Sequence, residues 1–187
     1  MQIRKAHQED AHAIAIVRVD SWKSTYQGLL PIRFLDSLSY RDIERYWSGI
    51  LVDPEKHGAT FVAEMPTGQI VGFALCGKTR DVKLKPEGEI FAIYLLQEYQ
   101  RQGIGRQLFL ACANQLRKSG LRGMAVWALE TNQIARGFYE RMGGEITLRK
   151  PAVFGGMRVT QVAYCWYNLN DLLEQSAPHL LHSEENP

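Results

Sequence analysis

Cysteine and histidine are too few and too scattered in this chain to indicate a disulfide framework or a metal site. The 187 residues contain three cysteines, Cys76, Cys112 and Cys165, and no two of them form a CxxC pair. An odd number at wide spacing predicts neither disulfide bonds nor a zinc site. The five histidines show no HxxxH or HExxH spacing. We therefore expect no metal in this protein.

Strong charge and long apolar segments are also missing. The net charge is only +2, whereas nucleic-acid-binding proteins usually show a marked basic bias. No apolar run approaches the ~20 residues of a membrane span. The first ten residues, MQIRKAHQED, lack the apolar core of a signal peptide. We expect no nucleic-acid partner, no membrane association and a cytoplasmic location.

What remains is the composition of an ordinary globular protein. Apolar residues make up 45% of the chain and charged residues 22%. This length can bury a substantial core without disulfides or metal. There are no repeats and no linker, so we expect a single domain over residues 1–170. Residues 171–187 form a tail that we expect to be partly disordered, because SAPHLLHSEENP has no pattern.

Hydrophobic periodicity predicts strands and helices that interleave along the chain. The first half reads as a strand, helices and a hairpin: 2–5 strand, 7–24 helix, 31–38 short helix, a helix after Ser39, and strands 59–65 and 68–77. The second half reads as strand 90–96, helix 104–119, strand 123–129, helix 132–142 and strands 145–149 and 159–167. A mixed sheet with helices on both faces would pack these elements. The unit 90–129 should cross over right-handed, which makes its two strands parallel.

A polar turn with two glycines, QRQGIG, separates the longest apolar run from a helix. Gly103 and Gly105 leave room for an anion to approach the free amides at the helix start, where the helix dipole is positive. The turn could therefore hold a phosphate group, with Arg101 and Arg106 adding charge at its rim. It lacks the Lys-[Ser/Thr] of a P-loop and the third glycine of GxGxxG. On spacing alone, the glycines could equally do no more than shape a connection.

Three segments resemble one enzyme family. Gln100 to Gly105 resembles the Q/R-x-x-G-x-G/A motif of the GNAT superfamily of acetyl-CoA-dependent N-acetyltransferases. ETNQIARGFYERMG, at 130–143, is similar to the N-x-x-A-x-x-F-Y-x-x-x-G segment of that family. VDSWKSTYQGLLP resembles the W-x-x-x-Y-x-G-x-L-P segment of a bacterial group within it. The similarity covers Gln2 to about Tyr167. It implies the GNAT fold of class α/β (α+β): a mixed, mostly antiparallel seven-stranded sheet with helices on both faces and splayed central parallel strands.

The resemblance also implies acetyl-CoA as co-substrate and positions that bind it. The amides from Arg101 to Arg106 would hold the diphosphate, and the backbone of the central strand would pair with the pantetheine arm, next to a β-bulge near Ile93. Asn132 would bind the pantetheine or cap its helix. The cofactor-binding positions are then Ile93, Tyr94, Leu95, Gln100, Arg101, Gln102, Gly103, Ile104, Gly105, Arg106 and Asn132.

Acetyl transfer to an amine moves two protons, and two residues are candidates to carry them. Tyr139 matches the tyrosine that lies near the thioether sulfur in the family, so it is the candidate acid. Glu89 opens the central strand and matches a catalytic glutamate of some members, so it is the candidate base, either directly or through water. Glu64 is a weaker rival. Structural roles are the alternative: a solvated strand entry for Glu89 and a core aromatic for Tyr139.

The acceptor is left open by the sequence. Trp22 and Tyr26 occupy the region where family members wall the acceptor pocket. The acceptor class is a small-molecule amine or a peptide amine, and Asp20, Asp36 and Glu89 are the only hints of a polyamine site. A homodimer is possible because final strands in the family often form dimer contacts. A non-catalytic acyl-CoA sensor and a nucleotide-phosphate binder are the alternative functions.

The chain departs from the family pattern at one position. Met142-Gly143-Gly144 stands where M-G-F is usual, so an aromatic side chain behind the cofactor site is missing. We expect Phe154 to fill the space under the final strands.

Overall fold

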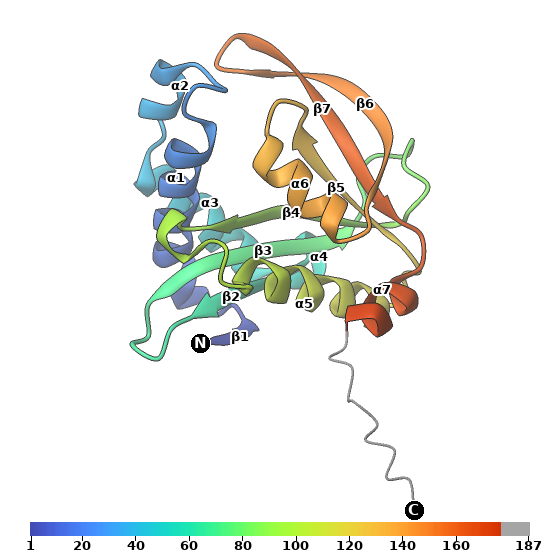
Figure 1. The fold of residues 1–187 in the computed structure, drawn as a ribbon. Coiled ribbons are helices and arrows are strands. Elements are labelled where there is room, and N and C mark those ends of the chain that lie inside the picture. The colour runs from blue at the N-terminus through green and yellow to red at the C-terminus, as the bar shows by residue number, and fades with distance from the viewer. Residues whose placement is uncertain (177–187) are drawn as a thin grey trace, which may run out of the picture.

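The protein folds around one seven-stranded sheet with the strand order β1-β2-β3-β4-β5-β7-β6 (Figure 1). The computed structural model describes residues 1–176. All neighbouring strands pair antiparallel except β4 and β5, which are parallel, as expected for the crossover through α5. The predicted fold class is therefore confirmed. The strands are β1 Gln2–Lys5, β2 Ala59–Glu64, β3 Ile70–Lys78, β4 Gly88–Leu95, β5 Met124–Leu129, β6 Glu145–Phe154 and β7 Met157–Trp166.

Helices cover both faces of this sheet. The helices are α1 Ala11–Tyr26, α2 Ile32–Asp36, α3 Tyr40–Val52, α4 Pro54–His57, α5 Ile104–Lys118, α6 Gln133–Arg141 and α7 Leu169–Ser176. Neighbouring residues of β3 show the two layers. A Cβ built on Gly72 would lie 3.2 Å from the Leu108 side chain of α5, whereas the Phe73 ring lies 4.8 Å from the Trp47 ring of α3. Successive side chains of a strand point to opposite faces, so α3 and α5 lie on opposite sides of the sheet.

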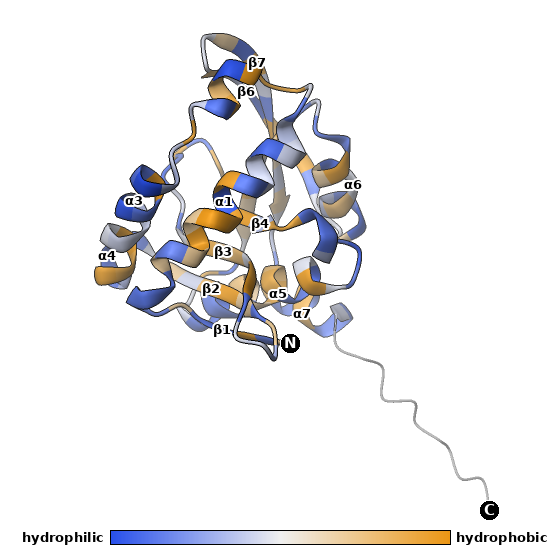
Figure 2. Ribbon diagram, turned by 90° about the vertical axis from the view of Figure 1, so that its left-hand side faces the viewer, coloured by the Kyte–Doolittle hydropathy of each residue, from blue (hydrophilic) through white to orange (hydrophobic). Residues whose placement is uncertain are grey.

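The core is densest along β3, between these two layers. Seven consecutive residues, Ile70 to Cys76, are buried. A strand covered on both faces needs apolar residues at every position rather than at alternate ones. Figure 2 shows the apolar residues gathered along β3 and on α1.

Several boundaries differ from those predicted, each for a local reason. α1 begins at Ala11 rather than His7, because the Asp10 carboxylate accepts the His7 amide (2.7 Å) and closes a short 3-10 turn first. β6 reaches Phe154, beyond the predicted end at 149. Pro151 is tolerated there because β6 is the edge strand of the sheet. α4 was not predicted; it starts with Pro54 and is capped by the Asp53 carboxylate.

The C-terminal boundary also differs. α7 runs from Leu169 to Ser176 and buries Leu169 and Leu172. The domain boundary predicted at residue 170 therefore falls inside a helix. Residues 177–187 of the predicted tail lie outside the described part of the chain. Within residues 1–176, no helix is both long enough and apolar enough to cross a membrane.

The two parallel strands separate soon after they begin. β4 and β5 pair only at Gly88–Met124, Glu89–Ala125 and Ile90–Val126, although β4 continues to Leu95 and β5 to Leu129. The register between β3 and β4 shifts at the same point, which leaves Phe91 as an extra residue in β4. This bulge bends β4 away from β5. The bulge lies two residues before Ile93, the residue near which it was expected.

Candidate functional site

The turn between β4 and α5 has the geometry of an anion site. Arg101 (φ 61°) and Gly103 (φ 80°) both have left-handed backbone conformations, and they turn the chain sharply into α5. The first helical hydrogen bond runs from the Gln107 amide to the Gly103 carbonyl, at 3.1 Å. The amides of residues 104–106 therefore precede the helical ladder and have no partner within it. A Cβ built on Gly105 would make one ordinary van der Waals contact, with Phe138 at 4.0 Å, so this position is loosely packed.

Two glutamines of the same turn hold its shape. The Gln100 side-chain amide donates to the Leu95 carbonyl (3.2 Å), and that of Gln102 donates to the Glu98 carbonyl (3.0 Å). Gln100 thus ties the turn to the end of β4. The Arg106 guanidinium donates to the Ser176 carbonyl at the end of α7 (2.8 Å), while Arg101 is exposed at the rim. Both arginines are exposed, and the single hydrogen bond of Arg106 to a neutral carbonyl leaves its positive charge near the turn.

The central strand offers a free backbone edge beside this turn. Phe91 to Leu95 lie beyond the last pair with β5, so the β5-facing side of this segment has no strand partner among the described residues. Ile93, Tyr94 and Leu95 all fall in it. An unpaired strand edge exposes amide and carbonyl groups in a regular row. It can pair with an extended chain that carries amides of its own.

Tyr139 lies in a buried aromatic cluster on α6. Its side chain is 5% exposed, and its ring lies 5.5 Å from that of Tyr164 and 6.2 Å from that of Trp166. Burial raises the pKa of the Tyr139 phenol well above its usual value, and the phenols of Tyr94 and Tyr164 raise it further. The hydroxyl therefore stays protonated at neutral pH.

Asn132 begins the same helix. It is buried, and its side-chain oxygen accepts the Ala135 amide at 3.1 Å. This is the N-cap role that the sequence left open beside a role in binding. The cap fixes the direction in which α6 leaves the end of β5, and with it the position of Tyr139.

Glu89 is buried in the segment of β4 that still pairs with β5. It is 7% exposed and belongs to the second of the three β4–β5 pairs, two residues before the bulge at Phe91. The Thr79 hydroxyl donates to Glu89 Oε2 (2.9 Å), and the Arg80 amide donates to the same oxygen at 3.4 Å. The structure thus holds a fixed carboxylate near the opening rather than a solvated one.

Glu64 does not belong to this site. It lies on β2, two strands away from β4. Its Oε2 accepts a hydrogen bond from Arg4 Nε at 2.8 Å. This hydrogen bond is the main cause that lowers the pKa of Glu64. An ion pair at the edge of the sheet leaves it no role in proton transfer at the opening.

Trp22 and Tyr26 meet the opened strand in a second aromatic cluster. The Trp22 ring lies 4.9 Å from Tyr26, 6.3 Å from Tyr94 and 5.9 Å from Phe154. The pKa of Tyr26 is raised well above its usual value, by burial first and then by Tyr94. α1, β4 and the tip of the β6–β7 hairpin therefore converge on one wall beside the unpaired segment of β4.

Comparison with known proteins identifies the family. Residues 19–144, more than half of the chain, match the acetyltransferase (GNAT) family. The chain belongs to the GNAT family. It is 36% identical over 170 residues to the uncharacterized N-acetyltransferase YuaI of Bacillus subtilis (strain 168), covering 91% of this chain and 95% of that protein. It is therefore an N-acetyltransferase.

More distant proteins match in sequence or in fold. The spermidine N(1)-acetyltransferase of Thermoplasma acidophilum is 23% identical over 151 residues, 78% of this chain and 89% of that protein. The crystal structure of PaiA N-acetyltransferase from the same organism, in complex with coenzyme A, superposes with a TM-score of 0.66 at 20% identity. That match covers 86% of this chain and 96% of the other.

The missing aromatic of the GNAT pattern is replaced by a residue that the sequence did not indicate. A Cβ built on Gly144 would lie 2.5 Å from Cζ2 of Trp166, so the Trp166 ring occupies this space. Its indole N–H donates to the Met142 carbonyl at 2.7 Å, which fixes the ring. The expectation that Phe154 fills the floor was wrong, because Phe154 lies at the hairpin tip against Trp22.

We expect Gly144→Ala to lower the free energy of unfolding by about 1–3 kcal/mol, the usual range for overpacking a rigid site. Its added methyl would meet the Trp166 ring, which its hydrogen bond holds in place. Denaturant unfolding would measure the change. Gly49→Ala is the matched control, because Gly49 lies in α3 with nothing within 4 Å of its built Cβ. It should unfold at equal or higher denaturant, and equal stability of all three proteins would contradict this packing argument.

Sequence reasoning missed one residue of this GNAT site. The Arg18 guanidinium carbon lies 3.8 Å from the Trp22 ring centroid and 4.5 Å from that of Tyr94. Arg18 precedes Trp22 by four residues on α1, so the two share a helix face. This spacing could have identified Arg18 from the sequence, because it places a cation one helical turn before Trp22, a candidate wall residue of the acceptor pocket.

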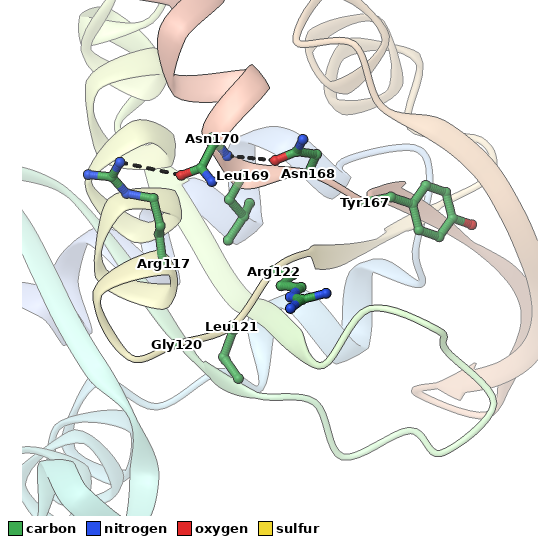
Figure 3. A pocket seen from close by; sticks show the side chains of 8 residues that line it. All are labelled: Arg117, Gly120, Leu121, Arg122, Tyr167, Asn168, Leu169 and Asn170. Atoms are coloured by element: carbon green, nitrogen blue, oxygen red, sulfur yellow. Dashed lines mark hydrogen bonds between the residues drawn. The ribbon is translucent and has the colours of Figure 1, made fainter.

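Two hollows accompany the site. A groove of about 730 Å³ passes over Phe91 and Ala92 of β4 and beside Arg18. A separate cavity of about 620 Å³ lies between the C-terminal end of α5 and the start of α7, lined by Arg117, Arg122 and Tyr167 among others (Figure 3). None of the predicted site residues lines either hollow. Only the groove contacts the unpaired segment of β4, through Phe91 and Ala92, so it is the one that bears on the site.

Proposed function

We propose that this protein transfers the acetyl group of acetyl-CoA to a primary amine by direct attack in a ternary complex. The observation that carries the proposal is the separation of β4 from β5 after Ile90, next to a turn whose amides at 104–106 are free. Such an arrangement suits a long thioester with a diphosphate at its far end.

The free groups of this region fit coenzyme A part by part. The amides of residues 104–106 and the positive end of the α5 dipole would bind the diphosphate. The open edge of β4 from Phe91 to Leu95 would pair with the two amides of the pantetheine arm. Arg101 and Arg106 would contribute charge at the rim, since both are exposed and both stay charged.

A ternary complex is supported by the placement of the two sets of residues. α5 and its N-terminal turn lie on one face of the sheet, and α1 with Trp22 and Tyr26 lies on the other. Both reach β4 at its unpaired segment. A thioester bound from the first side and an amine bound from the second would meet there without a covalent enzyme intermediate.

The protein's own groups would then handle charge and protons. Acetyl-CoA supplies the thioester carbonyl, whose carbon forms a bond to the amine nitrogen as its bond to sulfur breaks. A β4 amide near the bulge would stabilise the charge that develops on the carbonyl oxygen. Glu89 would accept the proton that the nitrogen loses, directly or through water. The Tyr139 hydroxyl would donate a proton to the leaving sulfur.

The pKa of Tyr139 predicts the alkaline side of the pH–rate profile. Because burial raises this pKa, the phenol stays protonated beyond the ordinary phenol pKa of about 10. The rate should rise with pH as the acceptor amine loses its proton, with no decline caused by Tyr139 below about pH 10. The rate constant kcat/KM measured against pH checks this. A decline near pH 8 that disappears in Tyr139→Phe would contradict it.

Two measurements test the proposal as a whole. Calorimetry should show acetyl-CoA binding, and a thiol-release assay should show coenzyme A appearing only when an amine is added. The assay is repeated with Glu89→Gln, which keeps the side-chain shape but removes the base. Full activity of that variant would mean that Glu89 is not the base. Absence of acetyl-CoA binding would overturn the proposal.

The predictions about domain organisation, cellular location and oligomeric state are part of this proposal. We propose that a single catalytic domain carries all of these residues. A cytoplasmic location and the homodimer that the sequence left open stay predictions.

A further inference from the structure

We infer that the acceptor is an amine that also carries a carboxylate, and that Arg18 binds this carboxylate. The inference rests on the proposed function and names the substrate class of the same site.

Arg18 is fixed in place, and one of its terminal nitrogens lacks a hydrogen-bond partner among the residues that the structure describes. Its guanidinium stacks on Trp22 and Tyr94, at 3.8 and 4.5 Å from the two ring centroids. Stacking of this kind holds the plane of a guanidinium and leaves its N–H groups free at the edge. Its Nη1 is buried, and within residues 1–176 it has no hydrogen-bond partner. A buried charged donor without a partner costs free energy, and an anionic ligand would remove that cost.

The groove beside Arg18 is strongly cationic. Its lining contains five lysines and arginines but only one carboxylate, that of Glu55. The five cations are Lys5, Arg18, Lys56, Lys78 and Arg80. None of them forms an ion pair in the described part of the chain. A cleft lined by one sign of charge concentrates ligands of the opposite sign.

Two guanidinium groups border the segment where the acetyl group is proposed to lie. Arg80 lies 4.2 Å from the Phe91 ring centroid, and Arg18 stacks on Tyr94. Phe91 and Tyr94 enclose the start of the unpaired edge of β4. An amine placed to attack there therefore has a fixed cation close by. A carboxylate on the same molecule could accept two parallel hydrogen bonds from the planar guanidinium.

The same charges disfavour a polyamine acceptor. The three acids that hinted at such a site do not provide one. Asp20 accepts the Tyr40 hydroxyl (2.5 Å), and neither it nor Asp36 lines the groove. Glu89 is held by Thr79 and the Arg80 amide. A molecule with several positive charges would meet like charges along the groove. We therefore expect this chain to differ in acceptor from its relative that acts on spermidine.

The test is a thiol-release panel on the intact protein with acetyl-CoA. The panel contains α- and ω-amino acids, the carboxamide of each, short peptides and spermidine. In the unaltered protein, the best amino acid should exceed its carboxamide in kcat/KM by roughly 30-fold or more, the factor for one well-formed buried charge pair. In Arg18→Met the ratio of kcat/KM for the amino acid to that for its carboxamide should fall to within a few-fold of one. The change should come mainly from a higher KM for the amino acid. Acetyl-CoA affinity should not change.

Arg41→Met is the matched control, since Arg41 is exposed on α3 and does not line the groove. It should keep the preference for the acid. Arg18→Lys keeps the charge but not the planar fork, and should retain only part of the preference. Equal rates for acids and carboxamides in the unaltered protein, or spermidine as the best acceptor, would overturn the inference while leaving amine acetylation intact. Coenzyme A release with no member of the panel would contradict the proposed function as well.

Discussion

Replacing Tyr139 with phenylalanine is expected to lower kcat by about 100-fold or more, the usual contribution of a positioned general acid. The ring would keep its contacts with Tyr164 and Trp166, and only the hydroxyl would be lost. Sulfur would then leave without a proton from the enzyme. Steady-state thiol release at saturating acetyl-CoA and amine measures the effect.

The affinity for acetyl-CoA separates this role from a structural one. Because Tyr139 is buried in the core, a structural role would appear as a lower melting temperature or weaker cofactor binding. We expect calorimetry to give an unchanged dissociation constant. Tyr164→Phe is a comparison within the same cluster: the Tyr164 hydroxyl donates to Glu140 (2.7 Å) and is not proposed to act in catalysis. If both variants lost the same activity, the acid assignment for Tyr139 would be wrong.

Replacing Gly105 with valine is expected to weaken acetyl-CoA binding by roughly 30-fold or more. This corresponds to the loss of about two charge-assisted hydrogen bonds of the diphosphate. The added side chain would project beside the amides of residues 104–106, and its Cβ would make one ordinary contact, with Phe138 at 4.0 Å. The protein itself should therefore accommodate it. Calorimetric titration with acetyl-CoA measures the change.

Gly49→Val is the matched control for this variant. It makes the same change in the middle of α3, where a built Cβ meets nothing within 4 Å. Both variants should fold with similar melting temperatures, and only Gly105→Val should lose affinity. Gly103 is less suitable, because its φ of +80° would strain any other residue. Unchanged affinity in Gly105→Val would mean that the diphosphate does not rest on this turn.

Much of the fold could be predicted because its signals are local. The alternation of apolar runs with helical stripes follows from the repeat of side chains along each element. The order of the strands and longer helices was therefore predicted correctly, whereas α4 and α7 were not predicted. The QRQGIG turn was visible because a left-handed backbone at Gly103 favours glycine. Strand ends were less predictable. The length of β6 depends on its pairing with β7, which a residue such as Pro151 does not reveal by itself.

The sequence by itself determined the succession of the main strands and helices, the glycine turn at the start of α5 and the resemblance to the family, since these depend on spacing and on backbone freedom. Only the tertiary structure decided that β4 leaves β5 after Ile90, that Trp166 fills the space at Gly144, and that Arg18 lies between Trp22 and Tyr94. The physical reason is that each of these joins residues far apart in the chain. Packing and charge act between side chains that only folding brings together, so no local pattern records them.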